Sequence, residues 1–141
     1  MKAQTIENLD FYCADFARRI ADALLTGPEK VPGDDVAHMI TRLLSILHQN
    51  GLYAALLYMV WKRHNGTPRE RRVMAVIEDM LVGKPGEATL LRLPEMAFKV
   101  EEAEDSLAVG RAIARSLDDI FLAKELLSRT LTYVRYQAQS A

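Results

Sequence analysis

Apolar residues recur every three or four positions along most of this chain, the spacing of one face of an α-helix. A first stripe predicts a helix from about Thr5 to Thr26, built on Ile6, Leu9, Cys13, Phe16, Ile20 and Leu24. Gly27 and Pro28 end it, because glycine accepts a positive φ and proline cannot continue a helix. A second helix is expected to begin at Asp34 or Asp35 and to bury Val36, Met39, Ile40, Leu43, Leu44 and Leu47.

The stretch from Leu52 to Trp61 has a different pattern, with no charged residue and apolar side chains on every face of a helix. A helix that is apolar all round is buried on all sides, so we expect this one to be central and surrounded by the others. Charge begins at Lys62 and Arg63, where it should reach the surface. Asn50-Gly51 either ends the preceding helix or kinks a longer one, and Gly51 is expected to serve close helix packing or a C-cap.

The second half of the chain begins with a strong helix start. Thr67, Pro68 and Glu70 supply a cap, a first-turn proline and the glutamate of a capping box. That helix should run to Gly83 and bury Val73, Val76, Ile77, Met80 and Leu81. After a loop with a short helical turn near 90–93, the pattern predicts a helix from about Glu95 to Leu117 and a last one from about Asp118 to Gln137, with or without a break between them.

No segment shows the alternation of a β-strand, and no internal repeat, low-complexity tract or linker divides the chain. A length of 141 residues suits one domain with a sizeable core. The sequence therefore predicts an all-α fold, a single-domain bundle of five or six helices over residues 1–141.

Charge and cysteine content narrow the classes of partner and compartment. The net charge of −1 gives no overall field that would steer the protein to nucleic acid or membrane, so any such binding needs a local patch. The single cysteine, Cys13, excludes an internal disulfide and suits a reducing, cytoplasmic compartment. The uncharged stretch 43–61 has nearly the length of a membrane span, but polar residues interrupt its middle, which favours a core helix and no membrane contact.

Catalytic and metal-binding patterns are weak. Among three histidines, only His38 has a carboxylate, Asp35, at a ligand-like spacing, whereas a di-iron bundle needs two such motifs. There is no glycine-rich phosphate loop, and no serine or cysteine has a recognisable activating base nearby in sequence. We therefore predict no catalytic residue, no metal site and no cofactor.

An acidic cluster offers one alternative, and it consists of Glu95, Glu101, Glu102, Glu104 and Asp105. All-α nucleotide pyrophosphatases hold magnesium with two glutamate-rich motifs on adjacent helices, and carboxylate oxygens are the ligands magnesium prefers. Only one motif of suitable spacing occurs here. The simpler interpretations are a solvated helical face or an acidic patch that meets a basic partner.

Basic residues gather around a predicted turn, where Glu70 is the one carboxylate that opposes Lys62, Arg63, Arg69, Arg71 and Arg72. Such a cluster is the local patch that phosphate contacts need in a protein without net positive charge. Two further sets are Arg111 with Arg115, four apart on one helix face, and Arg129 with Arg135, which flank Tyr133. An arginine cluster by itself is more often a solvated face than an RNA site.

Two stretches carry a family resemblance. Residues 46–63 read ILHQNGLYAALLYMVWKR, an apolar lead-in, then Asn-Gly-Leu, then an alanine- and leucine-rich helix that ends in basic residues. Residues 128–140 read SRTLTYVRYQAQS, with aromatics and arginines interleaved. The first stretch resembles the signature of the small subunit of type III-B CRISPR effector complexes, the Cmr small-subunit family, and the second resembles that family's closing helix.

The resemblance implies a non-catalytic, all-helical subunit of an antiviral ribonucleoprotein. Its copies would stack into a filament beside the guide-bound backbone subunits and the large subunit, and hold the guide–target RNA duplex through phosphate contacts without base readout. The nine basic residues named above would be the candidates for those contacts. Two other functions stay open, a magnesium-dependent nucleotide enzyme that uses the Glu101 to Asp105 cluster and a helical interaction domain without RNA contact.

Overall fold

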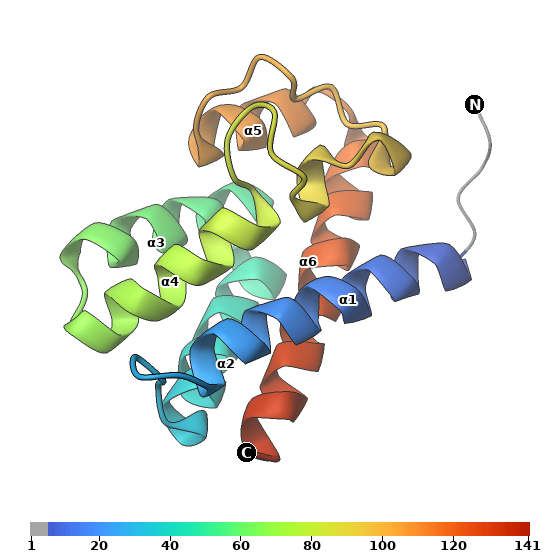
Figure 1. The fold of residues 1–141 in the computed structure, drawn as a ribbon. Helices are drawn as coiled ribbons and strands as arrows, with labels where there is room; N and C mark the ends of the chain where they lie inside the picture. The colour runs from blue at the N-terminus through green and yellow to red at the C-terminus, as the bar shows by residue number, and fades with distance from the viewer. Residues whose placement is uncertain (1–5) are drawn as a thin grey trace.

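The computed structural model describes residues 6–141, and this part of the chain is helical without any strand (Figure 1). Its α-helices are α1 (Ile6–Leu25), α2 (Gly33–Asn50), α3 (Leu52–Asn65), α4 (Pro68–Leu81), α5 (Ser106–Ile113) and α6 (Leu117–Gln139). Two short 3-10 helices, η1 (Leu90–Arg92) and η2 (Pro94–Met96), lie in the connection between α4 and α5. The prediction of an all-α bundle is confirmed.

Helix α6, the longest helix of the described chain, makes its main contacts with two neighbours. It packs along α1 and along α2, whereas α3 packs against α2, α4 and α5 (Figure 1). Buried side chains from all six α-helices and from both 3-10 helices form one contiguous hydrophobic cluster. None of the helices in residues 6–141 combines the length and the apolar composition that crossing a membrane requires.

The first two helices follow their predicted stripes. Cys13, Phe16, Ile20 and Leu24 are buried on α1, and the predicted cap residue Thr5 lies outside the described residues. Helix α2 begins at Gly33 after Pro32, so Asp34 and Asp35 lie within its first turn and make no cap hydrogen bond. Their carboxylates still face the positive end of the helix dipole.

The predicted central position of the Leu52–Trp61 helix is wrong. Leu52, Ala55, Leu56 and Met59 are buried on α3, but Tyr53, Leu57 and Trp61 are 41%, 48% and 54% exposed. Helix α3 is therefore covered on one side only, by α2, α4 and α5. A helix without charged residues still exposes some of its side chains when neighbouring helices cover only part of its surface.

Gly51 separates α2 from α3 because of its backbone conformation, not because two helices pack closely against it. It has φ 99° and ψ −178°, a conformation that essentially only glycine adopts. A Cβ atom built on Gly51 would meet nothing within 4 Å. The close helix contact lies instead at Gly110 of α5, where a Cβ atom would be 3.0 Å from Leu56 Cδ1 and 3.1 Å from Tyr53 Cδ1.

The predicted helix from Glu95 to Leu117 is also wrong, because only α5 forms within it and a break precedes α6. Ala97 has a left-handed φ of 58°, after which Phe98 and Val100 bury their side chains in the core from the loop. The Asp105 carboxylate accepts from the Ala108 N–H at 2.8 Å and so fixes the start of α5. Ser116 caps α6 in the same way and separates the two helices.

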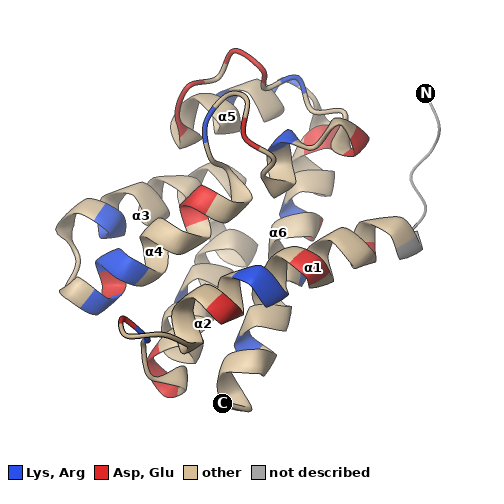
Figure 2. Cartoon of the chain, in the orientation of Figure 1, with Lys and Arg blue, Asp and Glu red and all other residues tan. Residues whose placement is uncertain are grey.

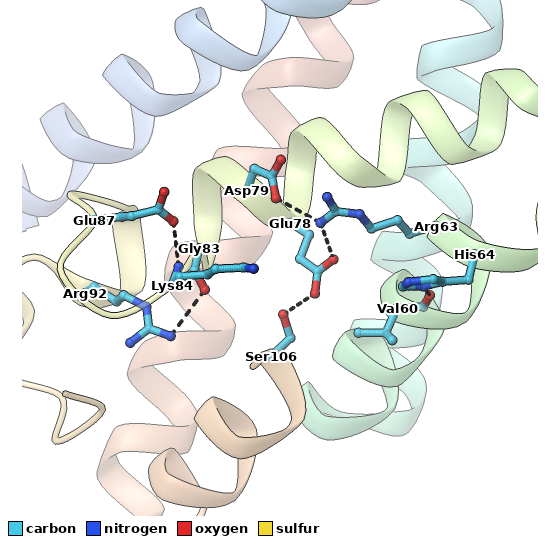
Figure 3. Close-up of polar contacts among 10 residues, drawn as sticks. All are labelled: Val60, Arg63, His64, Glu78, Asp79, Gly83, Lys84, Glu87, Arg92 and Ser106. Atoms are coloured by element: carbon cyan, nitrogen blue, oxygen red, sulfur yellow. Dashed lines mark hydrogen bonds and ion pairs between the residues drawn. The ribbon is translucent and has the colours of Figure 1, made fainter. Parts of the chain in front are cut away.

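Arg92 holds the long connection between α4 and α5 together. Its Nε donates to the Val82 carbonyl at 2.8 Å, and its Nη1 donates to the Val100 carbonyl at 3.0 Å. Its Nη2 donates to the Gly83 carbonyl at 3.2 Å (Figure 3). The same Nη2 donates to the Ala103 carbonyl at 2.6 Å. Burial lowers the pKa of Arg92 from its ordinary value, because desolvation disfavours the cation. Four carbonyl oxygens thus take the place of water around one guanidinium.

The conformation of Gly51 gives a first prediction. We expect Gly51→Ala and Gly51→Leu to lower the free energy of unfolding by a similar amount, about 1–3 kcal/mol, because the penalty lies in the backbone and both side chains project into open space. Urea denaturation followed by circular dichroism measures both values. A much larger loss for Leu than for Ala would mean that the position is crowded.

Arg92 gives a second prediction. Arg92→Met keeps most of the side chain's apolar stem but removes the Arg92 donor from the Gly83 and Ala103 carbonyls, so the free energy of unfolding should fall by about 2–3 kcal/mol. The Val82 and Val100 carbonyls keep a hydrogen bond from Thr89 Oγ1 and from the Ala103 N–H. Amide hydrogen exchange should show the loss of protection concentrated in residues 82–105. A matched control is Arg42→Met, since Arg42 is exposed on α2 and has no partner within residues 6–141. Equal effects of the two changes would contradict a structural role for Arg92.

Candidate nucleic-acid interface

The basic turn, which we define as Lys62, Arg63, Arg69, Arg71 and Arg72, lies where α3 ends and α4 begins (Figure 2). The predicted capping box is present. Thr67 Oγ1 accepts from the Glu70 N–H at 3.2 Å, and Glu70 Oε1 accepts from the Thr67 N–H at 2.9 Å. This reciprocal pair fixes the direction of α4 relative to the end of α3.

The two cations of α3 are held by carboxylates of α4. Lys62 is 16% exposed, and its Nζ lies 3.1 Å from Glu70 Oε2. Arg63 Nη1 donates to Glu78 Oε1 and to Asp79 Oδ1, both at 2.8 Å (Figure 3). The hydrogen bond to Glu78, followed by that to Asp79, raises the pKa of Arg63 against the effect of partial burial.

Two of the three α4 cations are also paired. Arg69 forms an ion pair with Asp35 of α2. Arg72 donates to the Ala23 carbonyl at 3.1 Å and lies 3.9 Å from a Glu29 carboxylate oxygen. Arg71 is exposed and has no partner within residues 6–141. Four of the five cations are thus paired, with five carboxylates in all, so the turn is nearly neutral. The sequence pattern did not reveal this, because four of those carboxylates lie outside the basic stretch.

The turn is connected to α5 through Glu78. While one Glu78 oxygen accepts from Arg63, the other accepts from the hydroxyl of Ser106, the first residue of α5 (Figure 3). Ser106 is 2% exposed, so this contact is part of the core boundary and not of the free surface. A phosphate that bound Arg63 would have to compete with a carboxylate that also anchors α5.

Arg111 and Arg115 lie in a different setting. Together with Lys99 they line an open cleft of about 620 Å³, whose other charged residues are Glu101 and Glu102. We call this the α5 cleft. Both arginines are exposed, and neither has a partner within residues 6–141. Three cations against two carboxylates leave the cleft with a small positive excess and with guanidinium groups that are free to bind an anion.

Lys99 is a cleft residue that the sequence analysis missed. It lies between Phe98 and Val100, both of which are buried, so its own side chain faces outward. The alternation of apolar, basic and apolar residues was the available signal. The prediction of a helix from about Glu95 to Leu117 hid this signal.

The candidates on α6 divide into a structural residue and a surface residue. Arg129 lies 3.2 Å from Asp10 Oδ1 and 2.7 Å from Glu125 Oε1, and the Tyr133 hydroxyl donates to the same Asp10 oxygen. These contacts join α6 to α1, and the hydrogen bond that Tyr133 donates to Asp10 raises the pKa of Tyr133. Arg135 is half-buried, with its guanidinium 5.9 Å from the Tyr136 ring centre.

The acidic cluster does not share a helical face. Glu101, Glu102 and Glu104 are exposed in the loop before α5, Asp105 caps α5, and Glu95 accepts a hydrogen bond of 2.8 Å from the Tyr12 hydroxyl. The expectation of a helical carboxylate face is therefore wrong. Within residues 6–141, no group of three or more His, Cys, Asp or Glu side chains is placed to hold a metal ion.

Comparisons with protein-family models, with curated proteins and with solved structures found no match for this chain.

The capping box gives a third prediction, on pH. The Thr67 N–H and then Lys62 lower the pKa of Glu70 from its ordinary value of 4.5. A carboxylate with a lowered folded-state pKa stabilises the fold above its unfolded pKa and loses that contribution as the pH falls through the folded one. Wild type should therefore be more stable than Glu70→Gln at pH 7, with the difference shrinking in acid below about pH 4.5.

Urea unfolding across this pH range measures the difference. Glu104→Gln is the matched control, because it removes the same charge from an exposed loop residue. A Glu70→Gln difference that persists unchanged in acid would contradict a role for the ionised carboxylate.

Proposed function

We propose that this chain is a non-catalytic small subunit of a type III CRISPR ribonucleoprotein. In this role it stacks with further copies beside the backbone and large subunits and helps to hold the guide–target RNA duplex. The resemblance of residues 46–63 and 128–140 supports the class, and the all-α fold agrees with it. The single observation that supports RNA contact is the α5 cleft, where Arg111 and Arg115 are exposed and free of carboxylate partners.

The chemistry of the cleft suits a phosphate backbone. Arginine binds phosphate oxygens through two parallel N–H donors, and this geometry carries no base information. The predicted shared helix face of Arg111 and Arg115 is wrong, because α5 ends at Ile113 and Arg115 lies in the turn that follows it. Both residues still line the same cleft, so both can contact one bound strand. Glu101 and Glu102 on the other lip oppose anions without pairing these arginines, which keeps the affinity of a single copy low.

In the proposed function, high affinity for RNA arises from the alignment of several copies along one duplex. A chain with a net charge of −1 attracts RNA little at long range. When copies present their clefts along one duplex, each further contact becomes intramolecular and the affinity multiplies. The basic turn adds less in this proposal, because four of its cations must first leave carboxylates, and Arg71 is its free member.

The fourth prediction tests the cleft in a reconstituted complex. Arg111→Ala with Arg115→Ala should leave assembly intact, lower the affinity for target RNA, and reduce the slope of log affinity against log salt by about 1.4–1.8 per subunit, as two lost phosphate contacts require. Filter binding across a salt series measures both quantities. The same double change in the turn, Arg69→Ala with Arg72→Ala, should change the slope less.

The matched control is Arg18→Ala with Arg19→Ala, which removes two exposed arginines that pair with Asp15 and Asp22 on α1. Unchanged RNA affinity in the cleft variant, with assembly intact, would contradict the proposal and favour a helical interaction domain. Nucleotide turnover with magnesium by the purified chain would favour the enzyme instead.

A further inference from the structure

The connection between α4 and α5 forms a second open cavity next to the α5 cleft. Its volume is about 600 Å³, within the range of pockets that hold small molecules. Buried Phe98 and Val100 line it together with the partly buried Leu93 and Pro94. We call this cavity the connection pocket. The proposed RNA contact makes no use of its apolar lining.

The polar groups of the connection pocket are few. Arg92 directs its N–H groups at four carbonyl oxygens of the chain, so this cation serves the fold. One carboxylate oxygen of Glu87 accepts from the Lys84 N–H at 2.7 Å (Figure 3). The other Glu87 oxygen has no hydrogen-bond partner within residues 6–141. The pocket therefore offers a ligand an apolar lining and a free acceptor.

The connection pocket and the α5 cleft adjoin each other. Lys99 and Glu101 line both cavities. In the α5 cleft the lining is cationic instead of apolar, because Arg111 and Arg115 are exposed there and unpaired within residues 6–141. An apolar compartment thus opens beside a cationic one, and Lys99 belongs to both.

We propose that the two cavities together bind a free nucleotide, with its base in the connection pocket and its phosphates in the α5 cleft. A base has two apolar faces and N–H donors at its edge, which suit the apolar lining and the free oxygen of Glu87. A chain of phosphates matches Lys99, Arg111 and Arg115, since guanidinium groups bind phosphate oxygens through paired donors. A fatty acid fits less well, because one carboxylate meets three cations and the hydrocarbon chain offers Glu87 no donor.

The RNA duplex of the proposed function cannot fill the connection pocket in this way. Its bases are stacked and paired, and the extrusion of one of them has a free-energy cost that a free nucleotide does not have. Nucleotide phosphates and RNA phosphates need the same two arginines, so the nucleotide should compete with RNA. This competition rests on the proposed function, whereas nucleotide binding by itself does not. Glu101 and Glu102 also line the cleft and weaken the binding of any phosphate.

Isothermal titration calorimetry of the purified chain, without RNA, tests the nucleotide site with ADP as the probe. Pyrophosphate supplies the phosphates without a base, and adenosine supplies the base without charge. ADP should bind about tenfold or more tightly than either, the order expected when one base contact is added or lost. Arg111→Ala with Arg115→Ala should weaken the binding of ADP and of pyrophosphate alike.

A variant of the connection pocket separates the base from the phosphates. Ala88 is exposed and lines the pocket, so Ala88→Leu places a larger side chain there. This change should weaken ADP binding about tenfold and leave pyrophosphate binding unchanged. Ala14→Leu is the matched control, because Ala14 is exposed on α1 and lines neither cavity, and this variant should bind ADP like wild type.

The reconstituted complex tests the competition. ADP should lower the affinity of the wild-type complex for target RNA in filter binding, whereas the Ala88→Leu complex should bind RNA normally and resist ADP. Circular dichroism checks that Ala88→Leu folds. If it does not, Ala97→Asn replaces it, because Ala97 also lines the pocket and asparagine tolerates its left-handed φ of 58°.

Three results would overturn the inference. The first is equal affinity for ADP and pyrophosphate, and the second is an Ala88→Leu chain that binds ADP like wild type. The third is an Ala88→Leu complex that binds RNA more weakly while its ADP binding is unchanged, since the pocket would then hold an unstacked base of the RNA. The salt series on Arg111 and Arg115 uses no nucleotide, so failure here leaves the proposed function to be judged separately.

Discussion

The structure depends on the four carbonyl oxygens that surround the Arg92 guanidinium. Residues 82–105 contain only two short 3-10 helices, so this connection cannot satisfy its carbonyl groups by regular hydrogen bonding. Arg92 ties the end of α4, through Val82 and Gly83, to the segment that leads into α5, through Val100 and Ala103. With that segment fixed, Phe98 and Val100 point inward and Lys99 points outward, so the α5 cleft exists because of this arginine.

Charge pairing decides which basic residues are available to a ligand. The densest basic stretch of the sequence is almost neutral in the fold, because Asp35 and Glu29 approach from other segments and Glu78 and Asp79 from the far end of α4. The sparser pair Arg111 and Arg115 is left free. Exposed ion pairs are individually weak, but a phosphate that approaches the turn must displace a carboxylate, whereas one that enters the cleft meets solvated guanidinium groups.

Close packing at Gly110 determines how much of α3 is covered. The absence of a side chain there lets α5 approach Leu56 and Tyr53, so α3 is buried along one side by α2, α4 and α5. No described helix covers its other side, where Tyr53, Leu57 and Trp61 remain exposed. The same helix thus contributes to the core with one face and presents an uncharged aromatic stripe with the other.

The sequence by itself determined the helical class, the stripes of α1, α2 and α4, and the capping box at Thr67, and it marked Gly51 as either a helix end or a kink. Each of these depends on residues within a few positions of one another, where spacing and backbone preference decide the outcome. The tertiary structure alone decided that α3 is covered on one side only, that Glu95–Leu117 is mostly loop, and that the basic turn is neutral. Those features depend on contacts between distant segments, such as Arg69 with Asp35 and Arg92 with Val100, which no local pattern contains.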